Sequence, residues 1–265
     1  MQSELDSHGS DTRYVVCPEQ NNIQSVSAAC LCLGAYLILN MEWTYQAVLD
    51  AFKAYAVHFS ISEPNGLNVS NTDCWRALAQ AKKLGWLVAP TDDSEPAMDV
   101  EEYLHYARRT NGSVHMSLPG KMLFFPAPTA LPDGQQWSDR LSEDGCTARH
   151  FSADFYADLL QDFGVSVVAC LGRSSPASAA ALSARGIETV DLRLADDGSS
   201  LLRGLDRLLT LERASPGPVA LHSGDGFRWP GYLGTLVAAL MISRLGFDEG
   251  SAGAWLRMVS PWMFR

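Results

Sequence analysis

The chain has 265 residues, of which 47% are apolar and 9% are aromatic. This composition is typical of a globular protein and provides enough apolar surface for one large domain or two smaller ones. Thirty acidic residues against twenty basic ones give a formal net charge of −10. That balance argues against a nucleic-acid binder or an anionic-membrane binder, and it would suit a basic protein partner.

The N-terminal residues show no signal-peptide pattern. They are polar and lack both a basic segment and an apolar core, so we expect a mobile tail. The longest apolar stretch, Val26 to Leu39, is short for a bilayer crossing and contains Ser, Gly and Cys, so no membrane span is expected. The six cysteines lack the spacing of zinc ligands and the density of a secreted disulfide scaffold. We therefore expect reduced, mostly buried thiols in an intracellular protein, with no metal and no cofactor.

Helical patterns dominate the first half of the chain. In order, the patterns predict a strand at 14–16 and helices at 25–39, 43–55, 73–84 and 98–110. Gly85 is expected to end the helix before it, and Asn111-Gly112 the charged helix that precedes the second half.

Strands and helices alternate through the second half. Strands are predicted at 114–118, 122–125, 166–170, 189–194 and 219–221, and helices at 152–163, 177–185, 201–212, 232–245 and 250–259. A Pro119-Gly120 turn makes the first two strands a hairpin. Residues 127–146 are rich in Pro, Gly and Asp and lack periodicity, so they are expected to be a surface insertion. The alternation predicts an α/β fold with a mostly parallel or mixed sheet flanked by helices.

The stretch after the last predicted strand contains an unusual loop. Its residues are His222, Ser223, Gly224, Asp225, Gly226, Phe227, Arg228, Trp229, Pro230 and Gly231. The strand, loop and apolar helix resemble the protein-tyrosine-phosphatase signature, H-C-x-x-G-x-x-R-[ST]-G. That signature uses a Cys nucleophile, an Arg six residues later and a hydroxyl beside the Arg. Here these positions are Ser223, Trp229 and Pro230.

Each replacement removes a part of the chemistry. A Cys at a helix N-terminus is ionised at neutral pH, whereas the hydroxyl of Ser223 needs a general base that this loop does not supply. Trp229 cannot provide the guanidinium fork, and Arg228 is one residue early. Pro230 removes a hydroxyl and a backbone N–H, and Asp225 adds a carboxylate that opposes phosphate. We expect no active catalytic residue in this degenerate loop.

Several further motifs occur in a characteristic order. They are Leu33-Gly34-Ala35-Tyr36, Asp73-Cys74, Asp99 to Tyr106, Pro119-Gly120-Lys121 and Ala254-Trp255-Leu256-Arg257. Their order resembles the mitotic-exit, cell-division-cycle-fourteen type of dual-specificity phosphatase over nearly the whole chain. The resemblance implies two tandem phosphatase-like domains, each a central sheet flanked by helices. It divides the chain into a polar tail (1–13), a non-catalytic domain (14–97), a linker helix (98–110) and a domain with the degenerate loop (111–265).

The resemblance also assigns roles to single residues. Cys17 follows a predicted strand as a nucleophile would, yet the residue six positions later is Ile23, so a buried core thiol is expected. The family's general acid lies on the loop after the fourth strand. Asp197 matches it and Asp196 resembles an insertion, so either could be a vestigial acid, or both could be solvated loop charges. The family's glutamine-bearing loop, which positions water, has no match after Arg257.

These features favour a pseudophosphatase, an inactive phosphatase-like protein that acts as a protein-interaction or structural scaffold. By analogy with the family, the setting would be intracellular: the cytoplasm, a cytoskeletal or ciliary assembly such as the centrosome, basal body or axoneme, or the nucleus. The first alternative is a non-hydrolysing binder of phosphopeptides or basic peptides, with Asp99, Glu101 and Glu102 in the groove that the resemblance implies. A less favoured alternative is an active enzyme with Ser223 as nucleophile. The hydrolase elbow G-x-S-x-G has small residues where this chain has Leu221 and Asp225.

Overall fold

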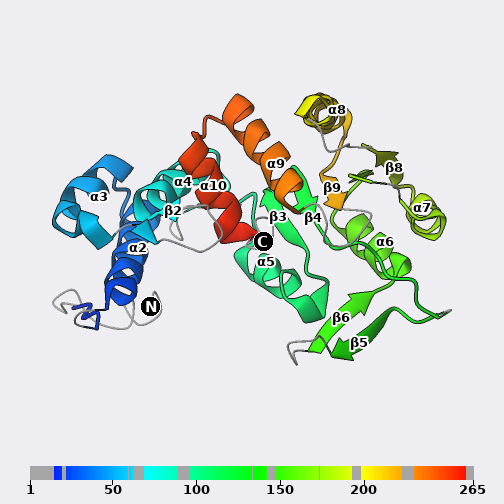
Figure 1. The fold of residues 1–265 in the computed structure, drawn as a ribbon, viewed down its shortest axis with the longest axis horizontal. Coiled ribbons are helices and arrows are strands. Elements are labelled where there is room, and N and C mark those ends of the chain that lie inside the picture. Colours follow the sequence, from blue (N-terminus) through cyan, green and yellow to red (C-terminus); the bar gives the residue numbers. More distant parts are fainter. Residues whose placement is uncertain are drawn as a thin grey trace.

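The computed structural model describes most of the chain. The described residues are 15–19, 22–58, 60–61, 69–88, 96–132, 134–141, 147–172, 174–192, 198–222 and 230–260. Helices of the N-terminal half lie at one end of an elongated molecule, and a sheet covered by helices lies at the other (Figure 1).

The sheet is formed by five strands of the C-terminal half. In spatial order they are β3 (His115–Leu118), β4 (Met122–Phe124), β9 (Val219–His222), β7 (Val167–Cys170) and β8 (Glu188–Asp191). The first pair is antiparallel and the other three pairs are parallel. The predicted mixed sheet and its opening hairpin are therefore confirmed, with β9 in the middle position.

Helices cover both faces of this sheet. The covering helices are α6 (Ala153–Asp162), α7 (Pro176–Ser183), α8 (Gly198–Ala214), α9 (Pro230–Arg244) and α10 (Glu249–Val259). Alternate strand residues point to opposite faces. Val168 and Ala220 join the cluster under α6 and α7, whereas Ala169 and Leu221 join the cluster under α8, α9 and α10. Two apolar cores thus hold the sheet from its two sides.

The N-terminal half is mainly helical. Its elements are α2 (Ile23–Asn40), α3 (Tyr45–Ala51), a 3-10 helix (Lys53–His58), the short antiparallel pair β1 (Ser60–Ile61) and β2 (Val69–Ser70), and α4 (Asn71–Lys83). The strand predicted at 14–16 is wrong for its described residues, because Val15 and Val16 are exposed and have no regular structure. Within the described part of this half, the only sheet has two strands. The predicted second phosphatase-like domain is not confirmed.

The long helix α2 differs from its expected length. It has 18 residues and a mean hydropathy of 1.6, which is enough by length and composition to cross a membrane. One such helix near the N-terminus is a weak indication, because a core helix passes the same test. In this structure Ser27, Cys30, Gly34 and Ile38 are the buried residues of α2, and the helix packs against α4.

The predicted surface insertion at 127–146 and the residues just after it contain regular structure that the sequence reasoning missed. Strands β5 (Trp137–Leu141) and β6 (Thr147–Phe151) form a second antiparallel hairpin. Arg149 pairs with Asp139 across the strands, with Nε 2.7 Å from Oδ1, and its guanidinium lies 5.4 Å from the centre of the Trp137 ring. These cross-strand contacts stabilise a segment whose composition resembles a loop.

The two halves share one apolar core. Buried residues of α4 and α10 belong to the same cluster, and the Trp86 ring lies 5.1 Å from that of Trp255 and 5.7 Å from that of Phe247. At the edge of this contact, Nη1 of Arg76 lies 2.6 Å from Oδ2 of Asp248. The N-terminal helices are therefore packed directly onto the sheet region.

The end of α10 also fixes the expected linker segment, where α5 spans Val100–Tyr106. The carbonyl of Val259 accepts hydrogen bonds from the Tyr103 hydroxyl at 2.6 Å and from His115 Nδ1 at 3.2 Å. Burial raises the pKa of Tyr103 to about 12. Burial lowers the pKa of His115 to about 4, against the weaker opposing effect of its bond to Val259.

We predict that Gly34→Ala destabilises the protein. A methyl group at Gly34 would overlap the indole of Trp75, which is fully buried and donates to the Leu31 carbonyl at 3.2 Å. Overpacking of this kind costs about 1–3 kcal/mol, which outweighs the gain of up to about 1 kcal/mol in helix propensity. Urea unfolding measures the change. Ala28→Ser, at an exposed position of the same helix, should stay within about 0.5 kcal/mol. Equal stability of the wild type and Gly34→Ala would contradict the close helix contact.

We also predict that His115 makes the protein less stable as the pH falls. The ordinary pKa of 6.5 describes the unfolded chain, and the folded value is about 4. Below 6.5 the unfolded state therefore binds a proton that the folded state does not bind until near pH 4. Across this window the free energy of unfolding should decrease by about 3 kcal/mol as the pH falls. At higher pH His115 should cause no such decrease.

The variant His115→Asn tests this effect, because Asn keeps an N–H donor near the Val259 carbonyl but does not titrate. Urea unfolding near neutral pH and again near the lower end of the window should show a smaller loss for the variant than for the wild type. His105→Asn, on the exposed side of α5, is the control for replacing a histidine by Asn. The same slope in all three proteins would exclude His115 as the cause.

Candidate functional site

The predicted loop begins at the carboxyl end of the central strand. His222 is the last residue of β9 and is 2% exposed. It pairs with Cys170 of β7, its carbonyl accepts from Leu171 N at 3.0 Å, and its ring lies 5.0 Å from that of Phe125. His222 is thus held by the core of the sheet, at the edge where α/β proteins place their ligand-binding loops.

The loop itself lies outside the described residues from Ser223 to Trp229. This range includes six further predicted site residues: Gly224, Asp225, Gly226, Phe227, Arg228 and Trp229 itself. Helix α9 begins directly afterwards, with Pro230 and Gly231 as its first two residues. The strand before the loop and the helix after it are confirmed. The arrangement of the loop's side chains stays a prediction.

The expected general-acid segment follows β8. Asp196 and Asp197 lie outside the described residues, so their vestigial role stays a prediction. The strand before them ends at Asp191, whose Oδ1 accepts from Ser174 N at 3.1 Å and whose carbonyl accepts from Arg207 Nη1 at 3.0 Å. These contacts fix the point at which the segment leaves the sheet.

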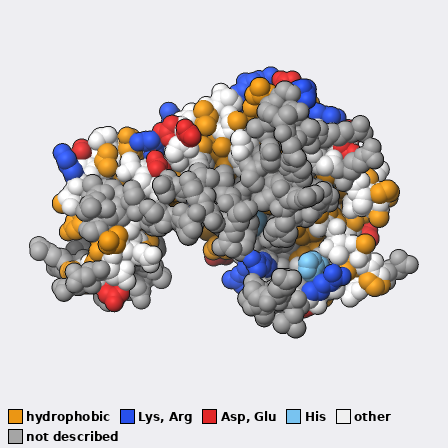
Figure 2. Space-filling model, in the orientation of Figure 1, with side chains coloured by type: hydrophobic (Ala, Val, Ile, Leu, Met, Phe, Trp, Pro, Cys, Tyr) orange, Lys and Arg blue, Asp and Glu red, His pale blue; other side chains and the backbone are white. Residues whose placement is uncertain are grey.

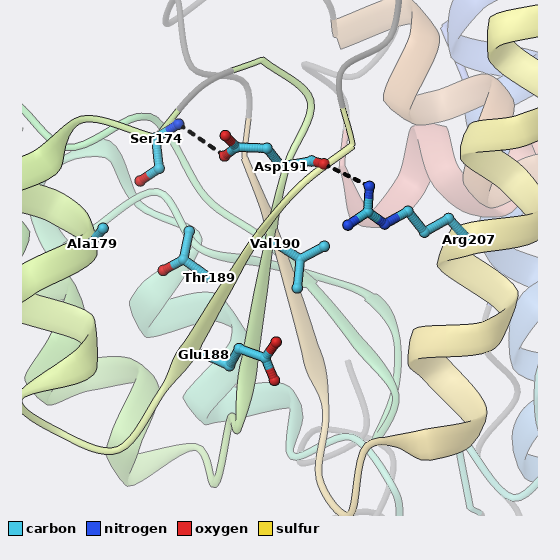
Figure 3. A pocket seen from close by; sticks show the side chains of 7 residues that line it. All are labelled: Ser174, Ala179, Glu188, Thr189, Val190, Asp191 and Arg207. Atoms are coloured by element: carbon cyan, nitrogen blue, oxygen red, sulfur yellow. Dashed lines mark hydrogen bonds between the residues drawn. The ribbon is translucent and has the colours of Figure 1, made fainter.

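Sequence reasoning missed a groove beside this strand. Figure 3 shows its lining residues, which come from α7 and the segment just before it, from β8 and from α8. They are Ser174, Ala179, Glu188, Thr189, Val190, Asp191 and Arg207. The groove exists because β8 is the outermost strand, and the order of strands in space cannot be read from a single sequence.

The three acidic residues of the linker segment lie at the start of α5, one as the helix cap and two in the first turn. Asp99 caps α5, where its Oδ1 accepts from Glu101 N at 2.8 Å and from Glu102 N at 3.0 Å. The side chains of Glu101 and Glu102 are exposed in the first turn of the helix. Acidic residues stabilise a helix at this end, so the three residues have a structural role that needs no ligand.

The cysteines do not all follow the expectation. Cys30, Cys74 and Cys170 are buried, but Cys17 and Cys32 are exposed. Burial raises the pKa of Cys30 and raises that of Cys74 to about 11, with a further contribution from Asp73. The prediction of a core thiol at Cys17 is wrong, because residues 15–19 lie on the surface without regular structure.

The described residues contain no group of three or more His, Cys, Asp or Glu side chains that could hold a metal ion. Charged side chains of both signs are interspersed on the face shown in Figure 2, and Lys and Arg side chains gather near its upper edge, over α8. The chemistry of a binding site must be judged from its own residues.

Comparison with known proteins identifies relatives. No protein-family model matches the chain. Tyrosine-protein phosphatase cdc-14 of Caenorhabditis elegans is 28% identical over 236 residues, which cover 86% of this chain and 30% of that protein. Dual specificity protein phosphatase CDC14AB of Danio rerio is 25% identical and CDC14A of Homo sapiens 24% identical, each over 239 residues and 88% of this chain. The chain spans between 30% and 37% of the length of these relatives.

Solved structures give a weaker match. The crystal structure of Tk-PTP in the active form aligns with 56% of this chain and 85% of that chain, at 22% identity and a TM-score of 0.37. This similarity is too low to support a conclusion about the site. The sequence matches, in contrast, extend through both halves of the chain. They show that the protein is a distant homologue of the CDC14 dual-specificity phosphatases.

Proposed function

We propose that this protein is a pseudophosphatase that acts as a protein-interaction or structural module. One observation carries the proposal: the sequence between β9 and α9 has Ser223, Trp229 and Pro230 where the phosphatase signature has Cys, Arg and a hydroxyl residue. A phosphatase must stabilise the charge that develops on the transferring phosphoryl group. Three changed positions remove the nucleophile, the cation and the assistance to the leaving thiolate together.

The surrounding fold supports a retained structural role. The strand that leads into the loop bonds to neighbours on both sides, and the helix that follows packs in the main core. Such a platform persists without catalysis because its stability comes from apolar burial. We further propose that residues 14–97 and 111–265 are two tandem phosphatase-like units joined at 98–110, and that the partner is a protein in a cytoskeletal or ciliary assembly.

A second candidate function is peptide binding without hydrolysis. The exposed carboxylates of Glu101 and Glu102 favour it, because they are available to a basic peptide while Asp99 is used as a helix cap. Asp225 and the missing Arg at position 229 disfavour a phosphorylated residue in the loop. A peptide recognised by its basic residues alone remains compatible with these charges.

The first prediction from this proposal is that the protein does not hydrolyse para-nitrophenyl phosphate above the buffer blank near neutral pH. Neither a thiolate nor an Arg six residues after it is present in the loop. The C. elegans tyrosine-protein phosphatase cdc-14 serves as the positive control in the same assay. Turnover that disappears in the Ser223→Ala variant would show that Ser223 is a nucleophile and would overturn the proposal.

The second prediction is that Ser223→Cys alone does not restore turnover. The new thiol would still lack the Arg fork and the hydroxyl that assists its departure, and loss of a single oxyanion donor already costs about 10²–10³ in kcat in a well-studied protease. Release of para-nitrophenol over many turnovers is the measurement.

The matched control is the triple variant Ser223→Cys, Trp229→Arg, Pro230→Ser, which supplies all three groups. Hydrolysis by the triple variant but not by the single one would assign the loss to positions 229 and 230. Substantial turnover by Ser223→Cys alone would instead show that Arg228 reaches the phosphate, and it would contradict the argument from spacing.

A further inference from the structure

The groove beside β8 is open along the edge of the sheet. Its volume is about 550 Å³, within the range of about 300–1,000 Å³ that is common for ligand sites. The strand β8 forms its floor, α7 lies on one side and α8 on the other (Figure 3). In the described part of the chain β8 pairs with β7 alone, so its other edge faces the groove.

The backbone of β8 presents unused hydrogen-bonding groups to this groove. Glu188 N donates to Ser166 O at 2.9 Å and Leu192 N donates to Cys170 O at 2.7 Å. In a parallel ladder alternate residues face the neighbouring strand, so Thr189 and Asp191 face outward. The carbonyl of Asp191 confirms this direction, because it accepts from Arg207 at 3.0 Å.

The other outward groups have no partner among the described residues. They are the N–H and C=O of Thr189 and the N–H of Asp191. An open strand edge of this kind is a template for an added strand. An extended peptide placed at the ordinary strand spacing of about 4.8 Å could bond to all three groups.

Side chains in the groove wall also lack partners. The hydroxyl oxygens of Ser174 and Thr189 are buried and make no hydrogen bond. Figure 3 shows Thr189 on the side of α7 and Val190 on the side of α8, as strand alternation requires. Buried hydroxyls normally have a partner, so these two oxygens are unsatisfied polar groups in the groove wall.

The charged side chains that line the groove indicate which kind of strand would bind there. Among the described lining residues, the carboxylates of Glu188 and Asp191 stand beside one cation, Arg207, which already donates to the Asp191 carbonyl. A second copy of the chain paired through β8 would bring four carboxylates into one short ladder, which like-charge repulsion opposes. A basic strand would be attracted instead.

We propose that the edge of β8 binds an extended basic peptide as an added strand. The backbone groups of Thr189 and Asp191 provide the ladder, and Glu188 and Asp191 provide the preference for Lys or Arg. This proposal deepens the proposed interaction role by naming the chemistry of the partner, and it rests on that part of the proposed function. Because the test reads binding and not hydrolysis, its failure is distinguishable from failure of the pseudophosphatase assignment.

The probe is the acetylated and amidated peptide Lys-Val-Lys-Val-Lys-Val-Lys, titrated into the isotope-labelled full chain and followed by amide NMR. We expect saturable binding with the largest shifts at Thr189 and Asp191, and slower hydrogen exchange at both amides. The peptide with Glu in place of each Lys is the charge control. The Lys peptide with Pro in place of each Val is the backbone control. Neither control should bind.

Two variants make the test specific. Thr189→Pro removes one donor of the edge without needing a bond inside the sheet, and it should weaken binding about tenfold, as expected for one lost hydrogen bond. Thr189→Val keeps that donor and removes only the hydroxyl, so it should weaken binding less. Glu188→Lys reverses the charge of an exposed side chain and keeps the backbone bond of this residue to Ser166, so it provides a second probe if Thr189→Pro does not fold.

The proposal is overturned by any of three results. The first is absence of saturable binding by the Lys peptide. The second is equal binding of the Glu peptide. The third is binding that is unchanged in both Glu188→Lys and folded Thr189→Pro, which would place the peptide elsewhere on the protein.

Discussion

The packing of α10 against α4 is the contact on which the rest of the structure depends. A surface helix normally buries only one stripe of side chains. In α10, by contrast, the consecutive residues Ser251 to Leu256 are all buried. Small side chains on α10 let the two helices approach closely. A Cβ at Gly250 would lie 2.5 Å from Asp73 Oδ1 of α4. The first turn of α10 is fixed by a capping box between Asp248 and Ser251. Position and direction of this helix are therefore determined by packing and by its cap together.

This one helix also positions the sheet. The indole of Trp255 donates to the Ser117 carbonyl of β3 at 2.9 Å, and the Val259 carbonyl at the other end of the helix holds Tyr103 and His115. A helix end leaves carbonyls that need donors, and here the donors come from α5 and β3. The hairpin of β3 and β4 is thereby fixed beside β9, whose end carries the degenerate loop. Helix α10 is thus linked to β9 through the hairpin of β3 and β4.

Local signals predicted the helices and strands well where they act over a few residues. Ser152 and Ser175 cap α6 and α7 by accepting from the backbone three residues later, and Gly120 has the positive φ of +69° that a tight turn requires. Such signals are written in adjacent residues. The hairpin of β5 and β6 was missed because it depends on cross-strand pairs such as Asp139 with Arg149, which are ten positions apart.

The same difference between local and long-range signals applies to the candidate site. The strand and the helix around the signature loop follow from periodicity, whereas the burial of His222 as the last residue of β9 was not predicted. The groove on β8 does not, because no local pattern shows that β8 is outermost or that Thr189 faces away from β7. Only the sheet order β3-β4-β9-β7-β8 makes that edge available. Binding surfaces formed by tertiary arrangement are thus missed by motif reasoning even where each of their elements is predicted.

Under the proposed function, the fold is kept for its shape and not for a reaction. Apolar burial around β9 involves Leu221, Ala220 and Val219, each fully buried, and none of these residues has a catalytic function in the signature. In the sequence, the three altered positions follow this strand. In such a protein, unpaired backbone at a sheet edge is more informative about function than the inherited loop, because backbone donors and acceptors bind a partner strand without any catalytic group.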